Sequence, residues 1–333
     1  MTQHHNLENV PFSAGFEPGL PSPEVARLAL RGLRGVVAND GPLPLGALRT
    51  LRAYARWLRL DADVAALAPA EPSEVAAGIV DVGLRVQVVR AAVVAALMDG
   101  RPRRAVAARL RRLSRALDTE LVAVREVAWL ARGHHRLARL SVLSRFWVRD
   151  ELRRRVGRDG IGYLLEGIAT FVGLFENPRR ASRFVSLRAL PVGTLGRELV
   201  DFYDANGFAL PGERGATPEA IMLHDLSHVL AGYGTDPMSE VQAACFQGGY
   251  RRTNPFAMVM FVLLQFHLGL RCTPGAPAEV GQVDPDLAID AVRRGAAMNR
   301  DLTDGVWDPW PVMNVPVRRL CRDYHLPPPR RAA

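Results

Sequence analysis

The sequence predicts an all-α protein made of two helical domains. From Pro23 to about Asp150, apolar residues recur at three- and four-residue spacing with arginines between them, which is typical of amphipathic helices. The alternation that indicates a strand is almost absent, and the helical pattern returns after residue 191, interrupted by Pro/Gly-rich loops at 209–218 and 273–285. A length of 333 residues leaves room for two domains. We therefore expect an N-terminal bundle of αα-hairpins and a C-terminal helical domain.

The composition divides the chain into five consecutive segments. Residues 1–22 lack the basic and apolar regions of a signal peptide and the arginines of an import presequence, so they indicate a flexible tail. The helical bundle is expected over 23–150, and connecting helices or a linker over 151–190, where charged and glycine-containing stretches alternate. The second domain is expected over 191–327, before a short tail at 328–333. This organisation favours a cytoplasmic protein.

Charge and cysteine content exclude several classes of function. All 43 basic residues are arginines, so chemistry that needs a lysine amine, such as a Schiff base or a Walker-type phosphate site, is excluded. The net charge of +9 is spread along helices without interleaved stacking aromatics, so we expect no nucleic-acid partner. Cys245, Cys272 and Cys321 form no C-x-x-C pair, which indicates neither a disulfide framework nor a thiolate zinc site.

A helix that ends at Asp-Gly and precedes a second amphipathic helix occurs twice in the first half. Asp40-Gly41 leads into LRTLRAYARWLRLD, and Asp99-Gly100 leads into VAARLRRLSRALD, which is the pattern of αα-hairpins. Over about 23–150 this duplicated pattern resembles the TerB-like tellurite-resistance domain. The acidic residues that this family places after Asp-Gly are Pro, Leu, Arg and Ala here. The alternative is a plain helical bundle that packs against the second half or a partner.

The segment PEAIMLHDLSHVLAG concentrates residue types that bind metals. A helix start at Thr217 and a stop at Gly232 would place His224, Asp225 and His228 on one helix. At about 100° per residue, the three side chains then fall within an arc of roughly 100°. This spacing is suitable for holding a cation.

A second helix is expected to complete the site. Asp236-Pro237 is typical of a helix start, and a fold-back through GYGTD would bring Glu240 beside the first helix as an oxygen ligand. Two imidazoles with one or two carboxylates suit zinc, ferrous iron or manganese. We therefore predict a divalent metal site formed by His224, Asp225, His228 and Glu240.

Other interpretations of these residues remain open at this point. His224 can instead cap a buried polar pocket, Asp225 can pair with an arginine, and Glu240 can be an acid favoured by the helix dipole. The order is not H-E-x-x-H, so a zincin protease fits poorly. A metal-dependent phosphohydrolase with an adjacent His-Asp pair would also need an earlier histidine and a late aspartate.

The motif His224-Asp225-x-x-His228, eleven further residues and Glu240 resembles that of the Coq-four family of ubiquinone (coenzyme Q) biosynthesis proteins. The preceding PVGTLGRELVDFYDANG is similar to the family segment P-x-G-T-L-G-R. Downstream, RGA, two tryptophans and PVRRLCRDYHLPP are similar to the closing W and L-x-x-L-R-x-x-x-x-I of the family. The resemblance covers about residues 185–327.

The resemblance implies an all-helical domain with a zinc or iron site that replaces the ring carboxyl of a prenylated aromatic substrate by oxygen. It also implies other quinone-biosynthesis enzymes as partners at a membrane, and the chain is compatible with a homodimer. Asp225 would be a metal ligand, a catalytic acid or base, or a group that orients a histidine. The alternative is a non-catalytic lipid-binding scaffold with a structural metal.

The apolar run FAMVMFVLLQFHLGL, residues 256–270, is too short for a bilayer span of ~20 residues. It can line a groove for an isoprenoid tail, with Arg251 and Arg252 facing a membrane or an anionic head group. The alternative is an ordinary core helix. Membrane contact is thus expected to be peripheral, on the inner face of the cell membrane.

Overall fold

Sixteen α-helices and no strand occur in the described part of the chain, so the predicted all-α class is confirmed. The computed structural model describes residues 6–16, 19–38, 41–273 and 276–327. The N-terminal half contains the helices α1 (Pro23–Val37), α2 (Leu45–Trp57), α3 (Pro72–Gly78), α4 (Val82–Leu97), α5 (Arg104–Ala116), α6 (Val122–Leu130) and α7 (His135–Ser144). The remaining α-helices are α8 (Trp147–Asp159), α9 (Ile161–Phe171), α10 (Pro178–Val185), α11 (Leu195–Asn206), α12 (Met222–Ala231), α13 (Pro237–Tyr250), α14 (Phe256–Val262), α15 (Pro285–Ala296) and α16 (Val317–Asp323).

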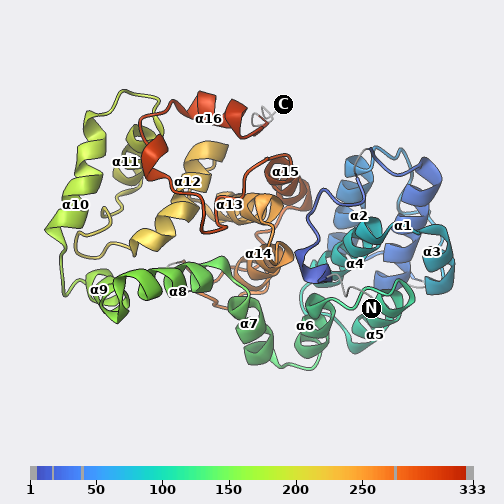
Figure 1. Ribbon diagram of the computed structural model, residues 1–333. Helices are drawn as coiled ribbons and strands as arrows, with labels where there is room; N and C mark the ends of the chain where they lie inside the picture. The colour runs from blue at the N-terminus through green and yellow to red at the C-terminus, as the bar shows by residue number, and fades with distance from the viewer. Residues whose placement is uncertain (1–5, 17–18, 39–40, 274–275, 328–333) are drawn as a thin grey trace, which may run out of the picture.

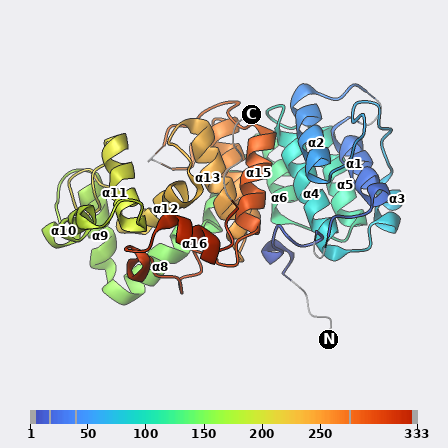
Figure 2. The same cartoon turned by 90° about the horizontal axis from the view of Figure 1, so that it is seen from above.

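The helices follow one another from one end of an elongated molecule to the other and then return to its middle. Helices α1 to α6 form a bundle at one end, and α8 to α12 lie at the opposite end (Figures 1 and 2). Helices α13, α14 and α15 lie between these groups, with α15 packed on α2 and α14 on α7. The C-terminal half therefore supplies the centre of the molecule.

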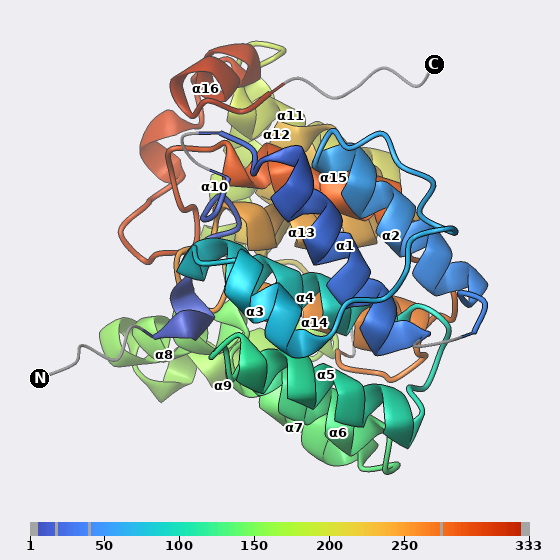
Figure 3. The same ribbon diagram turned by 90° about the vertical axis from the view of Figure 1, so that its right-hand side faces the viewer.

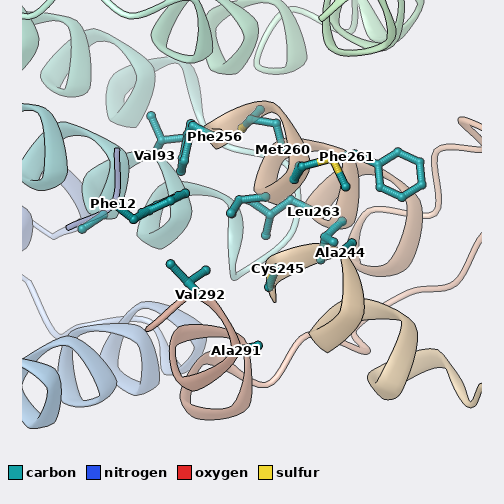
Figure 4. Close-up of a cluster of buried hydrophobic side chains, with 14 of the residues drawn as sticks. Phe12, Val93, Ala244, Cys245, Phe256, Met260, Phe261, Leu263, Ala291 and Val292 are labelled. Atoms are coloured by element: carbon teal, nitrogen blue, oxygen red, sulfur yellow. The ribbon is translucent and has the colours of Figure 1, made fainter. Parts of the chain in front are cut away.

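One continuous hydrophobic core runs through both halves of the described chain. Figure 4 shows Val93 of α4 together with Phe256 of α14 and Val292 of α15. Arg49 of α2 also forms an ion pair with Asp284, 2.9 Å long, across the same boundary. The two halves that the sequence predicts as separate domains thus share apolar packing, because helices of the second half insert beside the first.

The residues before α1 differ from the flexible tail that the sequence predicts. Phe12 is only 5% exposed, and its ring centroid lies 6.2 Å from that of Phe256. The buried guanidinium of Arg90 lies 5.0 Å from the Phe12 centroid, as in a cation–π contact. The segment around Phe12 is short and has no repeating apolar pattern, so the sequence could not reveal this packing.

Asp99, in the second Asp-Gly pair, caps a neighbouring helix. Its carboxylate accepts hydrogen bonds from the backbone N–H groups of Gly46, at 2.7 Å, and Ala47, at 2.8 Å. These donors lie in the first turn of α2, where a negative charge is favourable. The first pair was predicted to include Asp40, which lies outside the described residues.

Helices α13 and α15 cross at a contact between two glycines. A Cβ atom added at Gly295 would lie 2.1 Å from the Phe246 carbonyl oxygen, and one at Gly249 would lie 2.3 Å from the Val292 carbonyl oxygen. Backbone surrounds both positions, so the clash cannot be relieved by moving a side chain. This close approach fixes the position of α13, which carries Glu240.

Replacing Gly295 by alanine is expected to lower the free energy of unfolding by about 3 kcal/mol, because the two helices must separate. Urea unfolding of the two proteins measures this difference. The matched control is Gly157→Ala in α8, where an added Cβ meets no atom within 4 Å. That change should be neutral or stabilising by about 0.5–1 kcal/mol. Equal stabilities of the two variants would contradict the helix contact.

Candidate metal centre

Both helices predicted for the site are present in the structure, but the first of them begins later than predicted. α12 carries His224, Asp225 and His228 and ends at Gly232, which adopts a left-handed conformation with φ of 72°. The predicted start at Thr217 is replaced by a 3₁₀ turn, η3 (Glu219–Ile221), that precedes α12. The second helix, α13, begins after Asp236 as predicted, and the Asp236 carboxylate accepts hydrogen bonds from two backbone N–H groups of its first turn.

Three of the four predicted metal-binding residues meet between α12 and α13. The Nε2 atom of His224 lies 3.1 Å from both His228 Nε2 and Glu240 Oε2, and His228 Nε2 lies 3.7 Å from Glu240 Oε1. One ligand atom from each residue lies within 4.8 Å of the others. This spacing makes His224, His228 and Glu240 a candidate triad for a metal ion.

The hydrogen bonds of the two imidazoles orient their ligand atoms. His228 Nδ1 lies 2.7 Å from the Gly234 carbonyl oxygen, which can only accept a hydrogen bond. His224 Nδ1 lies 3.3 Å from the side-chain oxygen of Gln247. With both protons on Nδ1, the two Nε2 lone pairs point into the same space. Two lone pairs only 3.1 Å apart repel each other unless a proton or a metal ion lies between them.

Gln247, which the sequence analysis missed, is held in a buried network behind His224. Its side chain is fully buried, and its Nε2 donates to Ser227 Oγ at 3.3 Å. The hydroxyl of Tyr250 lies 3.1 Å from the same Ser227 Oγ. These contacts direct the amide oxygen toward His224. The sequence does contain a signal for Gln247: it is a polar residue within an apolar stretch, two helical turns after Glu240, and therefore lies on the same face of the helix.

Electrostatic coupling within the triad favours a positive charge between the side chains. Burial alone would lower the pKa of His224, but the hydrogen bond to Glu240 and its negative charge raise that pKa to about 9. Burial opposes ionisation of Glu240, yet the two imidazoles hold its pKa far below the usual range. A proton therefore occupies His224 at neutral pH in the metal-free protein, and a divalent cation can replace it.

The stability of the metal-free protein is expected to fall between pH 6.5 and about 9. The folded-state pKa of His224 lies above its usual value of 6.5, so its stabilising contribution is complete below pH 6.5 and disappears as pH rises through 9. We expect a loss of about 1–3 kcal/mol in urea unfolding. The metal-loaded protein should lack this loss, because the cation takes the place of the proton on His224 and, as pH rises, fewer protons compete with it for the imidazole. The fall in stability with pH should also be absent in His224→Gln. A fall that persists in this variant would show that another group titrates.

Asp225 lies beside the triad without joining it. Its carboxylate accepts a 2.5 Å hydrogen bond from the hydroxyl of Tyr203, a buried residue of α11. Burial raises the pKa of Asp225 above its usual range, although the charge of His224 opposes this effect. The arginine partner considered from the sequence is thus replaced by a tyrosine. No sequence spacing connects α11 with α12, so Tyr203 could not have been found from the sequence.

The triad opens into a cavity of about 1190 Å³. His224, Asp225 and Glu240 line it, whereas the His228 side chain lies behind them and is 1% exposed. Most of the remaining lining is apolar; α8 and α9 contribute many of these side chains, and Met258 of α14 is another. The volume exceeds the roughly 300–1,000 Å³ of typical small-molecule sites. A metal held by the triad would face this cavity through its open coordination positions.

The run over 256–270 contributes to both the core and the cavity. It forms α14 and then a π-helical turn, η4 (Leu263–His267), and most of its side chains are buried. Phe261 and Phe266 also line the cavity. The segment therefore supplies both core side chains and part of the cavity lining. Arg251 differs from the expectation that it faces a membrane, because its side chain is buried and only 3% exposed. The described helices include none that is long and apolar enough to cross a bilayer.

Comparisons with known proteins found no match among protein-family models, curated proteins or solved structures. A functional interpretation therefore depends on the geometry of the triad, its hydrogen-bond partners and the cavity.

Proposed function

We propose that this protein is a metal-dependent enzyme that converts a prenylated aromatic acid during the formation of ubiquinone or a related quinone. The observation that carries the proposal is the opening of the His224–His228–Glu240 triad into a large, mainly apolar cavity. An apolar cavity with a few polar groups at one place suits an amphiphile that has a long apolar part. The resemblance of the motif to the Coq-four family supports the same substrate class.

The donor set of the triad fits a zinc or iron ion. Two imidazole nitrogens and one carboxylate leave coordination positions open, as in catalytic zinc sites and in non-haem iron oxygenases. When bound, zinc would polarise the oxygens of the substrate, whereas iron would add oxygen chemistry. His224, His228 and Glu240 would hold the ion, and Gln247 would keep His224 oriented toward it.

The reaction proposed is oxidative decarboxylation of the aromatic ring. The bond between the ring and the carboxyl carbon breaks, and a ring–hydroxyl bond forms. With dioxygen as the oxidant, one aromatic acid, one dioxygen and two reducing equivalents yield one phenol, one carbon dioxide and one water. The two reducing equivalents must come from an external electron donor. The side chains of the protein then need only to bind the aromatic acid beside the triad and to transfer protons there.

Asp225 is suited to move a proton at the wall of this site. Its raised pKa favours a protonated carboxyl at higher pH than usual, and Tyr203 fixes the orientation of its Oδ2 atom. A carboxyl group with this environment can donate a proton to a ring carbon or accept one from a phenol. We therefore assign Asp225 the role of acid or base and leave metal binding to the other three residues.

The experiment combines metal analysis with turnover. Purified full-length protein is reconstituted with Fe²⁺ or Zn²⁺ and incubated with a prenylated hydroxybenzoic acid, dioxygen and a two-electron donor. We expect near-stoichiometric metal and release of carbon dioxide with formation of the phenol. Metal without turnover, combined with unfolding on chelation, would favour the non-catalytic prenyl-lipid scaffold. Phosphate release from nucleotides or prenyl phosphates would instead favour the metal-dependent phosphohydrolase.

A further inference from the structure

Helix α9 and the turn after it carry large apolar side chains on the protein surface. We call this surface the α9 face, and it consists of Ile161, Leu165, Ile168, Phe171, Leu174 and Phe175. Each of these side chains is exposed, and the largest exposed fractions are 81% for Leu174 and 61% for both Ile161 and Leu165. A group of this size on consecutive turns is uncommon on a surface that faces only water.

The opposite side of α9 is also apolar, because it forms a wall of the cavity. Tyr163 and Gly167 are buried and line the cavity beside the loop at 215–218. Ile168 and Phe171 both line the cavity and remain exposed. Helix α9 therefore separates the cavity from the surroundings, and the cavity mouth has an apolar rim that is continuous with the α9 face. Apart from Glu166, which pairs with Arg180, the large side chains of α9 are apolar on both the cavity side and the exposed side, and each of these sides favours an apolar environment.

Positive charge lies beside this rim. Arg149 and Arg153 of α8 are exposed, line the cavity, and have no acidic partner among the described residues. In contrast, three of the four acidic residues of α8 and α9 are paired with arginines. These three are Glu151, Asp159 and Glu166. The uncompensated charge near the mouth is therefore positive.

Helix α7 of the N-terminal half also carries exposed apolar side chains. Helix α7 continues directly into α8 and lies on the same side as α8 and α9 in two perpendicular views (Figures 1 and 3). Leu137 and Leu140 of α7 are 48% and 61% exposed. The helix that precedes α8 thus also carries exposed apolar side chains.

We propose that the α9 face, together with α7 and the α8 arginines, rests on an anionic lipid bilayer and opens the cavity to the lipid phase. The apolar side chains would enter the acyl boundary, and Arg149 and Arg153 would contact phosphate groups of the lipids. This proposal deepens the proposed function, since it names the route by which an amphiphilic substrate reaches the triad. It also accounts for a cavity mouth that is apolar and positively charged at once.

A second copy of the chain is a less suitable occupant of this surface. In a two-fold dimer centred on the α9 face, the arginines beside one cavity mouth would approach those of the other copy. Like charges at such an interface are unfavourable, whereas anionic lipids neutralise them. The charge beside the rim therefore favours the bilayer.

The test is co-flotation of the full-length protein with vesicles of phosphatidylcholine alone or of an equal mixture with phosphatidylglycerol. We expect binding to the mixed vesicles that Leu165→Gln/Leu174→Gln weakens roughly tenfold or more, because two apolar side chains no longer enter the lipid. The matched control is Val80→Gln/Val82→Gln, which alters side chains of 80% and 53% exposure in the first bundle. That variant should bind like the unmodified protein.

Arg149→Gln/Arg153→Gln should lower binding to mixed vesicles roughly tenfold and should remove most of the preference for phosphatidylglycerol. Equal binding by all variants, or no binding by the unmodified protein, would overturn the proposal. So would a dimer in solution that Leu165→Gln/Leu174→Gln converts to a monomer, since a second copy would then cover the face. His228→Ala should still float with the vesicles, so loss of the metal site and loss of the lipid face give different results.

Discussion

Replacing His228 by alanine is expected to weaken metal binding roughly a thousandfold, because the candidate triad would lose one of its three ligand atoms. His228 contributes its Nε2 atom from behind the cavity wall, and its Nδ1 proton binds the Gly234 carbonyl oxygen. The substitution also removes that hydrogen bond, which costs about 1–3 kcal/mol of stability. Elemental analysis after dialysis measures the bound metal, and thermal unfolding shows whether the variant is folded.

Glu240→Gln tests the same site with less disturbance of packing. The amide keeps the size of the side chain but removes the negative charge that stabilises a cation between the imidazoles. We expect it to lose metal as His228→Ala does, with a thermal stability that responds little to added metal. His134→Ala is the matched control, because His134 is exposed in the turn between α6 and α7, away from the triad. Full retention of metal by both site variants would show that the ion binds elsewhere.

The second large effect is expected for Asp225→Asn. This change should lower the turnover rate roughly 10²- to 10³-fold, because an amide can neither donate nor accept the transferred proton. Metal content should stay unchanged, since the Asp225 carboxylate bonds to Tyr203 and lies outside the triad. Turnover and metal content are measured on the same preparation, so that the two effects can be separated.

Tyr203→Phe is the companion to Asp225→Asn. It removes only the 2.5 Å hydrogen bond to Oδ2 and leaves the carboxyl group in place. We expect a smaller fall in rate, together with a shifted pH profile of turnover, because the hydrogen bond changes how readily Asp225 ionises. A metal content that falls in Asp225→Asn but not in Tyr203→Phe would make Asp225 a ligand and contradict the role assigned here.

The local predictions agree with the structure where a short stretch of chain decides the outcome. The helix that carries His224 and His228 was predictable because an apolar pattern and Gly232 define it locally. The start of α13 at Asp236 was predictable for the same reason, since an aspartate cap followed by proline acts within one turn. The expected flexible tail differs from the structure at Phe12, which is buried against Arg90 and against Phe256, more than two hundred positions away in sequence.

The candidate site shows the same division between local and distant information. Residue types and helical spacing predicted four ligands, and the structure brings three of them together, His224, His228 and Glu240, because all three lie within one pair of consecutive helices. Gln247 left a weak helical signal. Tyr203 left none, because its contact with Asp225 depends on how α11 packs against α12.

By itself, the sequence determined the all-helical class, the exclusion of lysine chemistry and the two helices that bear the triad. These properties follow from composition and from periodicities that act over a few turns. Only the tertiary structure decided that Asp225 turns to Tyr203, that one core joins the two halves, and that α9 separates a large cavity from an exposed apolar face. Each of these depends on which helix faces pack together, and non-local packing free energy, rather than local propensity, makes that choice.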